Sequence, residues 1–154
     1  MQPAALSSLP RLGTTILPLD AACERFEIPY SAIKCPAGFP SPAADYIQDG
    51  LDFNDYLVHH KAATFVFDVS GYSMLGAGIY DGDKIVVDRS VSPRHGHIVV
   101  AVIDGEHTVK RLHMDGDEVE LHPESADYPI IRIAEGEELV IFGVVVGVVR
   151  KLRM

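Results

Sequence analysis

Short apolar and β-branched runs alternate with polar turns along the C-terminal two thirds of the chain. Several turns contain an Asp-Gly or Glu-Gly pair, and apolar runs bounded by such pairs are typical of short strands. The pair Asp104-Gly105 favours the type I′ turn of a tight hairpin. A mostly β body, either barrel-like or a sandwich, is therefore predicted. Its expected strands are Thr64–Val69, Lys84–Asp88, Ile98–Ile103, His107–His113, Glu118–His122, Ile130–Ile133 and Leu139–Arg150.

The first 45 residues have a different pattern. Seven of the ten prolines fall there, and no periodicity is sustained. Proline removes a backbone donor and fixes φ, so an extended, mobile arm is expected rather than a long helix or a central strand. Between this arm and the first predicted strand, Ser41–His60 has partial helical spacing. Ser41 suits a helix cap and Pro42 the first helical position, which predicts a short helix.

Composition narrows the functional classes. A net charge of −9 argues against a protein that wraps the phosphate backbone of nucleic acid. Cys23 and Cys35 cannot form a disulfide framework and are not spaced as a zinc finger. The apolar run Leu139–Val149 is too short to span a membrane, and the N-terminus lacks the pattern of a secretory signal. We therefore expect a single-domain protein of the reducing cytoplasm, without membrane contact.

No short motif singles out a nucleophile or a metal centre. The pair His59-His60 and the pair His95, His97 could each bind a metal, but no third ligand is suitably spaced, so no metal or cofactor is expected. Ser73 lies in the sequence Gly-Tyr-Ser-Met-Leu, which is not the nucleophile elbow of a serine hydrolase.

Lys110 has two possible interpretations. It shares one face of its predicted strand with Thr108 and Leu112, and neither face of that strand is cleanly apolar. It is either an exposed lysine on an edge strand or a buried amine that loses its proton. A neutral lysine can act as the base for a serine hydroxyl without histidine or aspartate.

Several separated stretches resemble a known family. Ser70–Ser90 reads SGYSMLGAGIYDGDKIVVDRS, and Gly96–Leu112 reads GHIVVAVIDGEHTVKRL. Together with Ala37–Tyr46 and Phe142–Val145, they closely resemble the LexA-like self-cleaving proteins, and within them the UmuD type. The resemblance covers about Cys35 to Arg153. It implies a β body like that of LexA and of signal peptidases, preceded by an arm that is cut off.

The resemblance assigns roles to particular residues. The family's nucleophile falls on Ser73 and its lysine base on Lys110, 37 residues later. Its cleavage site falls between Ala37 and Gly38, which implies an arm of residues 1–37 and a peptidase domain of residues 38–154 with its core at about 61–154. The backbone N–H groups of Tyr72 and Ser73 are the expected donors to the oxyanion.

The resemblance also implies a biological role. UmuD-type proteins are cytoplasmic homodimers of the SOS response that cut off their own arm when stimulated by RecA filaments on single-stranded DNA. The processed form then joins a UmuC-like Y-family polymerase for translesion synthesis. Two alternatives stay open: a dimeric adaptor that binds the polymerase without cleavage, and a fragment of a LexA-type or phage-type repressor. The first 40 residues cannot form the repressor's DNA-binding domain, so direct sequence-specific DNA binding is not expected, and a signal peptidase would need a membrane anchor.

Overall fold

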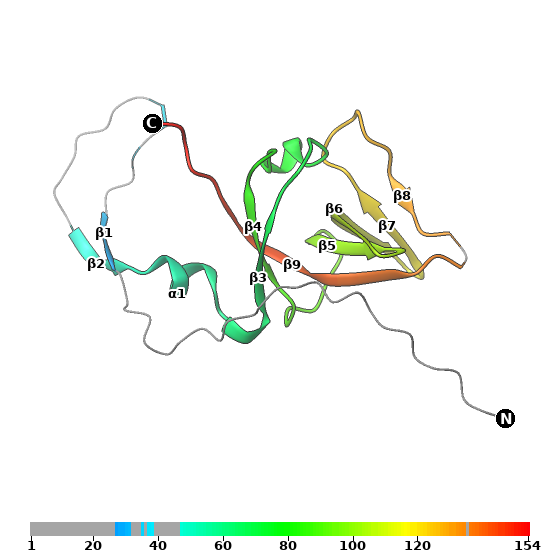
Figure 1. The fold of residues 1–154 in the computed structure, drawn as a ribbon, viewed down its shortest axis with the longest axis horizontal. Helices are drawn as coiled ribbons and strands as arrows, with labels where there is room; N and C mark the ends of the chain where they lie inside the picture. Colours follow the sequence, from blue (N-terminus) through cyan, green and yellow to red (C-terminus); the bar gives the residue numbers. More distant parts are fainter. Residues whose placement is uncertain (1–26, 32–34, 36, 39–46, 135) are drawn as a thin grey trace.

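The computed structural model describes residues 27–31, 35, 37–38, 47–134 and 136–154. These residues form a two-stranded sheet and a seven-stranded antiparallel sheet (Figure 1). The large sheet has the order β3-β4-β9-β5-β6-β7-β8. Its strands are β3 (Thr64–Asp68), β4 (Lys84–Asp88), β5 (Ile98–Ile103), β6 (Glu106–Asp115), β7 (Glu118–His122), β8 (Ile131–Arg132) and β9 (Leu139–Val149).

All seven predicted strands are confirmed, and their ends differ from the prediction by two residues or fewer. The turn between β5 and β6 also forms as expected, because Asp104 has a φ of 47° and Gly105 a φ of 88°. Positive φ at both central residues is the requirement of a type I′ turn. The fold is therefore mostly β, as the pattern of short runs and turns indicates.

The predicted helix over Ser41–His60 is wrong in extent. Ile47–Leu51 forms strand β2, which pairs with β1 (Ile28–Ser31). Only Phe53–Leu57 is helical (α1), and its cap is Asp52, whose Oδ1 accepts from the N–H of Asn54 at 2.7 Å. Cross-strand pairing outweighs the weak helical spacing, since tertiary contacts override intrinsic propensity. Ser41 and Pro42 lie outside the described residues.

Most of the predicted arm, residues 1–26, also lies outside the described residues. The part that is described includes β1, which contains Pro29 at the point where its register with β2 shifts. A proline is tolerated at such an irregularity because its missing N–H is not needed there. Among the described residues, no helix is long and apolar enough to cross a membrane.

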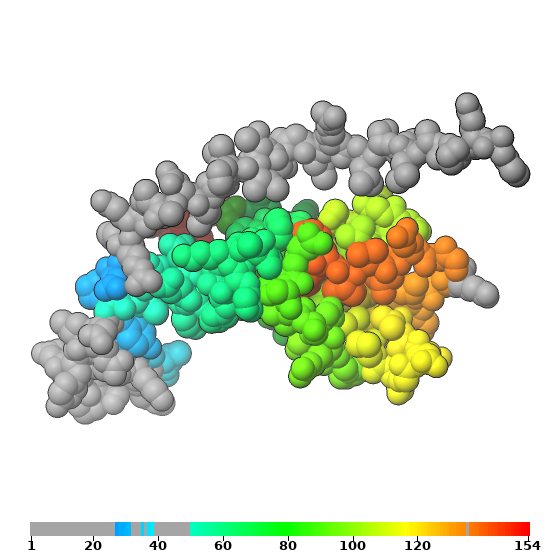
Figure 2. Space-filling view, turned by 90° about the horizontal axis from the view of Figure 1, so that it is seen from below, coloured from blue at the N-terminus to red at the C-terminus, as the bar shows by residue number. Residues whose placement is uncertain are grey.

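The large sheet buries side chains on both faces. Val99 belongs to one apolar cluster with Leu112 and Leu121, whereas its neighbour Val100 belongs to another with Met74 and Val87. Successive side chains on a strand point to opposite faces, so β5 contributes to both cores. From the underside, Figure 2 shows the segment between β4 and β5 (green) beside β7 (yellow). His95 of the same segment packs its ring on His113 of β6, the strand paired with β7, at 4.4 Å between centroids.

The sheet curls so that its first strand returns towards its fifth. Phe67 of β3 packs against His107 of β6, with ring centroids 5.9 Å apart, although β3 and β6 are not hydrogen-bonded neighbours. Residues 106–110 of β6 pair with β5 alone, because the pairing with β7 begins at Arg111. Within the described part of the chain, a seam bounded by two unpaired strand edges therefore runs between β3 and the first half of β6.

Candidate functional site

Ser73 lies in the loop that follows β3, close to this seam. Gly71 has a φ of +96°, which suits glycine, and its N–H donates to Asp81 Oδ1 at 2.8 Å. Met74, the next residue after Ser73, is 1% exposed and packs into the core. The loop is therefore anchored on both sides of Ser73.

A second segment holds this loop by its backbone. The N–H of Glu124 donates to the carbonyl of Ser73 at 2.7 Å, and the N–H of Gly76 donates to the carbonyl of Glu124 at 2.7 Å. A Cβ at position 76 would lie 2.7 Å from that carbonyl oxygen, so only glycine fits. The Glu124 carboxylate forms an ion pair with Arg111, which also donates to the carbonyl of Gly96 at 2.7 Å. The position of Ser73 thus depends on residues after β7.

Lys110 of β6 is buried and faces Ser73. The side chain is 8% exposed, so the interpretation as an exposed edge lysine is wrong. Its Nζ donates to Ser73 Oγ at 2.8 Å, to Thr108 Oγ1 at 3.0 Å and to the carbonyl of Val109 at 3.0 Å. No carboxylate forms an ion pair with it among the described residues. Burial lowers the pKa of Lys110 below its usual range.

The three partners of Nζ suit a neutral amine as well as an ammonium ion. A neutral amine has two N–H donors and one lone pair. The carbonyl of Val109 can only accept, and Thr108 Oγ1 can take the second N–H. The lone pair is then free to accept the Ser73 hydroxyl proton across 2.8 Å. The arrangement can therefore convert the serine into a nucleophile.

The pair lies in a cleft of about 200 Å³ along the seam. Apolar side chains of both strands and polar groups around Ser73 line it together. The lining residues are Phe67, Asp68, Val69, Ser70, Ser73, Ile85, Val100, His107, Thr108, Val109 and Lys110. Such a cleft can accept an extended chain beside the hydroxyl and the amine.

The remaining predicted site residues lie as follows. Within the described part of the chain, no acceptor bonds the backbone N–H of Tyr72 or of Ser73, and of these two residues only Ser73 lines the cleft. Ala37 and Gly38 are exposed, and neither lines the cleft. The structure thus brings Ser73 and Lys110 together but does not bring the expected cleavage site to them.

Sequence reasoning missed the residues that hold the pair in place. The strand pattern places Thr108 on the same face as Lys110 but gives it no role, and no motif marks Gly76. Glu124 and Arg111 carried no local signal, because their contacts join segments more than ten residues apart. Glu124 and Arg111 can be identified only once the pairing of β6 with β7 is known.

Comparisons with known proteins identify a family whose pattern this chain matches. Residues 29–146 match the family described as Peptidase S24-like. The chain is 49% identical to Protein ImpA of Escherichia coli over 125 residues, which are 81% of this chain and 85% of that protein. Protein MucA of Escherichia coli is 44% identical over 119 residues, 77% of this chain and 81% of MucA. The LexA repressor of Syntrophotalea carbinolica is 47% identical over 89 residues, 58% of this chain and 44% of the repressor.

Proposed function

This chain belongs to the Peptidase S24-like family, the LexA-like family that its motifs predict, and from this membership we propose that it is a self-cleaving serine peptidase. In this proposal Ser73 is the nucleophile and Lys110 the general base. The observation that carries it is the 2.8 Å contact between Lys110 Nζ and Ser73 Oγ inside a cleft, with a lysine that has only neutral partners among the described residues.

The proposed reaction is acyl transfer. Neutral Lys110 takes the hydroxyl proton while Ser73 Oγ attacks the carbonyl carbon of Ala37. The N–H groups of Tyr72 and Ser73 stabilise the tetrahedral oxyanion. When the C–N bond breaks, the Lys110 ammonium donates its proton to the leaving amine of Gly38. Water then hydrolyses the ester on Ser73, with Lys110 again as base.

The seam explains how a peptide segment would be held for this reaction. Residues of β3 and residues 107–110 of β6 line the cleft, and no strand of the described residues pairs with these two edges. An extended chain can hydrogen-bond to such a strand edge. Small residues at Ala37 and Gly38 would let the scissile bond approach Ser73. Because both residues are exposed and outside the cleft lining, cleavage requires this segment to dock, within one chain or into a second copy.

The biological proposal rests on the family. Residues 1–37 are the removable arm, and residues 38–154 are the peptidase domain, with its core at about 61–154. We propose a cytoplasmic homodimer that acts as an accessory protein of SOS mutagenesis. RecA filaments on single-stranded DNA stimulate the cut, and the processed form joins a UmuC-like Y-family polymerase for translesion synthesis.

The direct test is cleavage of the purified full-length chain. Incubation with activated RecA filaments should produce a fragment that begins at Gly38, as identified by intact mass and N-terminal analysis. Full-length Ser73→Ala should stay intact under the same conditions. A new N-terminus elsewhere would contradict the proposed cut, and cleavage of Ser73→Ala would contradict the proposed nucleophile.

A second experiment separates the peptidase from the non-cleaving adaptor. A chain that begins at Gly38 and carries Ser73→Ala should support lesion bypass, because the serine has no further role once the arm is removed. Full-length Ser73→Ala should fail in the same assay. If the full-length variant supports bypass fully, cleavage is irrelevant and the adaptor interpretation replaces the proposal.

A further inference from the structure

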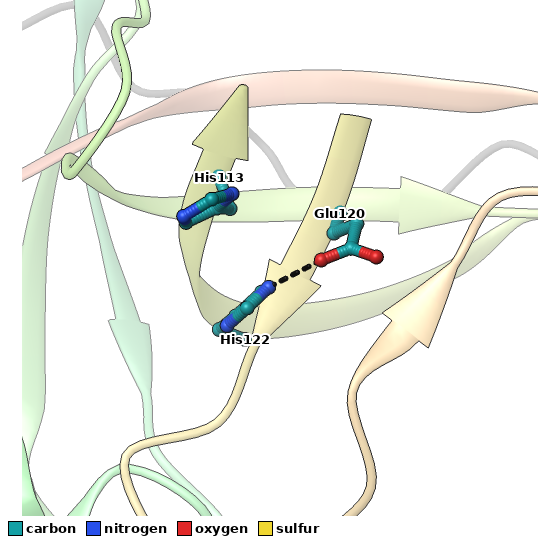
Figure 3. A group of neighbouring side chains, drawn as sticks. All are labelled: His113, Glu120 and His122. Atoms are coloured by element: carbon teal, nitrogen blue, oxygen red, sulfur yellow. Dashed lines mark hydrogen bonds and ion pairs between the residues drawn. The ribbon is translucent and has the colours of Figure 1, made fainter. Parts of the chain in front are cut away.

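Three potential metal ligands lie together on the hairpin of β6 and β7. His113 is directly opposite Glu120, and His122 lies two residues further along β7, on the same side as Glu120. Their donor atoms all lie within 4.8 Å of one another, and all three residues are half-buried (Figure 3). Leu112 and Leu121, on the opposite face, are at most 2% exposed, so the hairpin is fixed to the core beneath this group.

The donor set selects a class of ion. Two imidazoles and one carboxylate are the ligands of zinc sites that keep a fourth position for water. Imidazole also suits cobalt, nickel and copper, whereas calcium and magnesium prefer six or more oxygen ligands. The spacing of two residues on one strand and one directly opposite on its neighbour lets three side chains converge without a special loop.

Neighbouring groups already orient the carboxylate. Arg132 Nε donates to Glu120 Oε1 at 2.7 Å, which leaves Oε2 facing His122 Nε2 at 2.7 Å. An ion would replace the proton between Oε2 and Nε2, and Arg132 would remain as the outer partner of the ligating carboxylate. The positive charge of Arg132 opposes a cation, so it limits the affinity.

One rearrangement is required. The rings of His113 and His122 are stacked, with centroids 4.6 Å apart and an interplanar angle of 19°. The lone pair of an imidazole nitrogen lies in the plane of its ring, so parallel rings do not direct both nitrogens at one point. Rotation of the half-buried His113 side chain about its side-chain bonds would direct its nitrogen towards Glu120 and His122.

We propose that His113, Glu120 and His122 form a binding site for one divalent transition-metal ion of the zinc class. The site shares no residue with the cleft that holds Ser73 and Lys110, and the proposal does not depend on the proposed peptidase reaction. Binding would join β6 to β7 and stabilise the folded chain, because an ion that binds the folded state alone adds to its stability.

Calorimetric titration of the full chain with Zn²⁺ tests the proposal. Cys23→Ser and Cys35→Ser should form the background, so that thiols do not compete for the ion. We expect one equivalent to bind and the melting temperature to rise. His122→Asn and Glu120→Gln should each weaken binding by about 100-fold, on the scale of lost metal ligands and their partners. His59→Asn is the matched control, because His59 is exposed and outside the group.

Nitrogen NMR of the histidine rings identifies the ligands directly. Addition of Zn²⁺ should shift the ring nitrogens of His113 and His122 and leave those of His59 and His107 in place. Both ligand variants should retain the melting temperature of the metal-free chain to within a few degrees, which shows that they fold. Absence of binding, or His122→Asn binding as tightly as the unmodified background, would overturn the proposal and leave the group as a hydrogen-bonded network only.

Discussion

Buried charged side chains have different kinds of partners in two regions of this protein. Among the described residues, Asp83, Asp88 and Lys110 are the buried charged side chains. Asp83 directly precedes β4 and Asp88 is its last residue. Both carboxylates have charged or donating partners: Asp83 pairs with Arg150, and Asp88 accepts from Ser90 and contacts His60. Lys110, at the seam, has as its hydrogen-bond partners in the same part of the chain one carbonyl and two hydroxyls.

The same direction of pKa shift has opposite consequences in the two regions. The hydrogen bond from Arg150 lowers the pKa of Asp83. Burial would raise the pKa of Asp88, but hydrogen bonds from Ser90 and His60 hold it at about 2. Both carboxylates therefore stay charged, whereas burial lowers the pKa of Lys110 and favours the loss of its charge. Partners that stabilise the charged form mark a buried charge that supports the fold, whereas burial without such a partner marks a charge available for chemistry.

The largest expected effect is on cleavage after replacement of Lys110. Lys110→Arg keeps a positive charge but cannot give up its proton under working conditions, and Lys110→Met removes the base altogether. Both should slow cleavage by about 10³-fold or more, on the scale of general-base catalysis. Intact mass after incubation with activated RecA filaments measures the fraction cut. Cleavage by Lys110→Arg at a tenth of the original rate would show that Lys110 does not act as a base.

The next effect concerns stability and should reverse between the two regions. Asp83→Asn leaves Arg150 without its carboxylate, so the free energy of unfolding should fall by about 2 kcal/mol. Lys110→Met replaces a buried amine with an apolar chain of similar length, so the free energy of unfolding should stay within about 1 kcal/mol or rise. Denaturant unfolding in a Ser73→Ala background compares the two without interference from cleavage. If Lys110→Met lowers the free energy of unfolding more than Asp83→Asn does, then Lys110 rather than Asp83 is the buried charge that supports the fold.

Much of the fold could be predicted because its signals are local. The strands were found from alternating runs bounded by turn residues, and the type I′ turn from the dipeptide Asp104-Gly105 alone. Strand β2 was missed because its partner β1 lies about twenty residues earlier in a proline-rich stretch. No local pattern in residues 47–51 indicates that pairing, and the helical spacing nearby was weaker than the hydrogen bonds of a ladder.

In the candidate site too, some residues carry a local sequence signal and others depend on contacts between distant segments. The family motifs led to Ser73 and Lys110, which the structure brings into contact, while their catalytic roles stay predictions. The bonds from Glu124 to the Ser73 loop and the group of His113, Glu120 and His122 depend on strand register. Register could have been inferred from the short turn after Asp115, since a two-residue loop sets the residues that face each other on both strands.

The stability of the folded chain should depend on Lys110 at alkaline pH and on Asp88 at acidic pH. Unfolded lysine keeps its proton up to a pH of about 10.4, whereas folded Lys110 loses it earlier. In that window the unfolded chain binds more protons, so the stability relative to Lys110→Met should rise with pH. For Asp88, the stability relative to Asp88→Asn should be lost as the pH falls from about 4 towards its folded pKa of about 2.

Thermal melts across this range, again in the Ser73→Ala background, measure both effects. The cleavage rate of the unmodified chain should rise in the same alkaline window in which Lys110 becomes neutral. A rate that is flat from pH 7 to about 10 would show that cleavage does not depend on the loss of a proton from Lys110. The contrast between a catalytic lysine and two structural carboxylates would then fail.

The smallest expected effect tests whether the neutral partners of Lys110 matter. Thr108→Val keeps the shape of the side chain but removes the hydroxyl that lies 3.0 Å from Nζ. The amine then loses one of the acceptors that hold its lone pair towards Ser73, so the maximal cleavage rate should fall about tenfold. The lost acceptor had stabilised the ammonium form most, so the pKa of Lys110 should fall further and the midpoint of the pH profile should move to lower pH. Thr108→Ser restores the hydroxyl and should recover both the rate and the midpoint. A lower rate with an unchanged midpoint would mean that Thr108 only packs against the cleft and does not tune the amine.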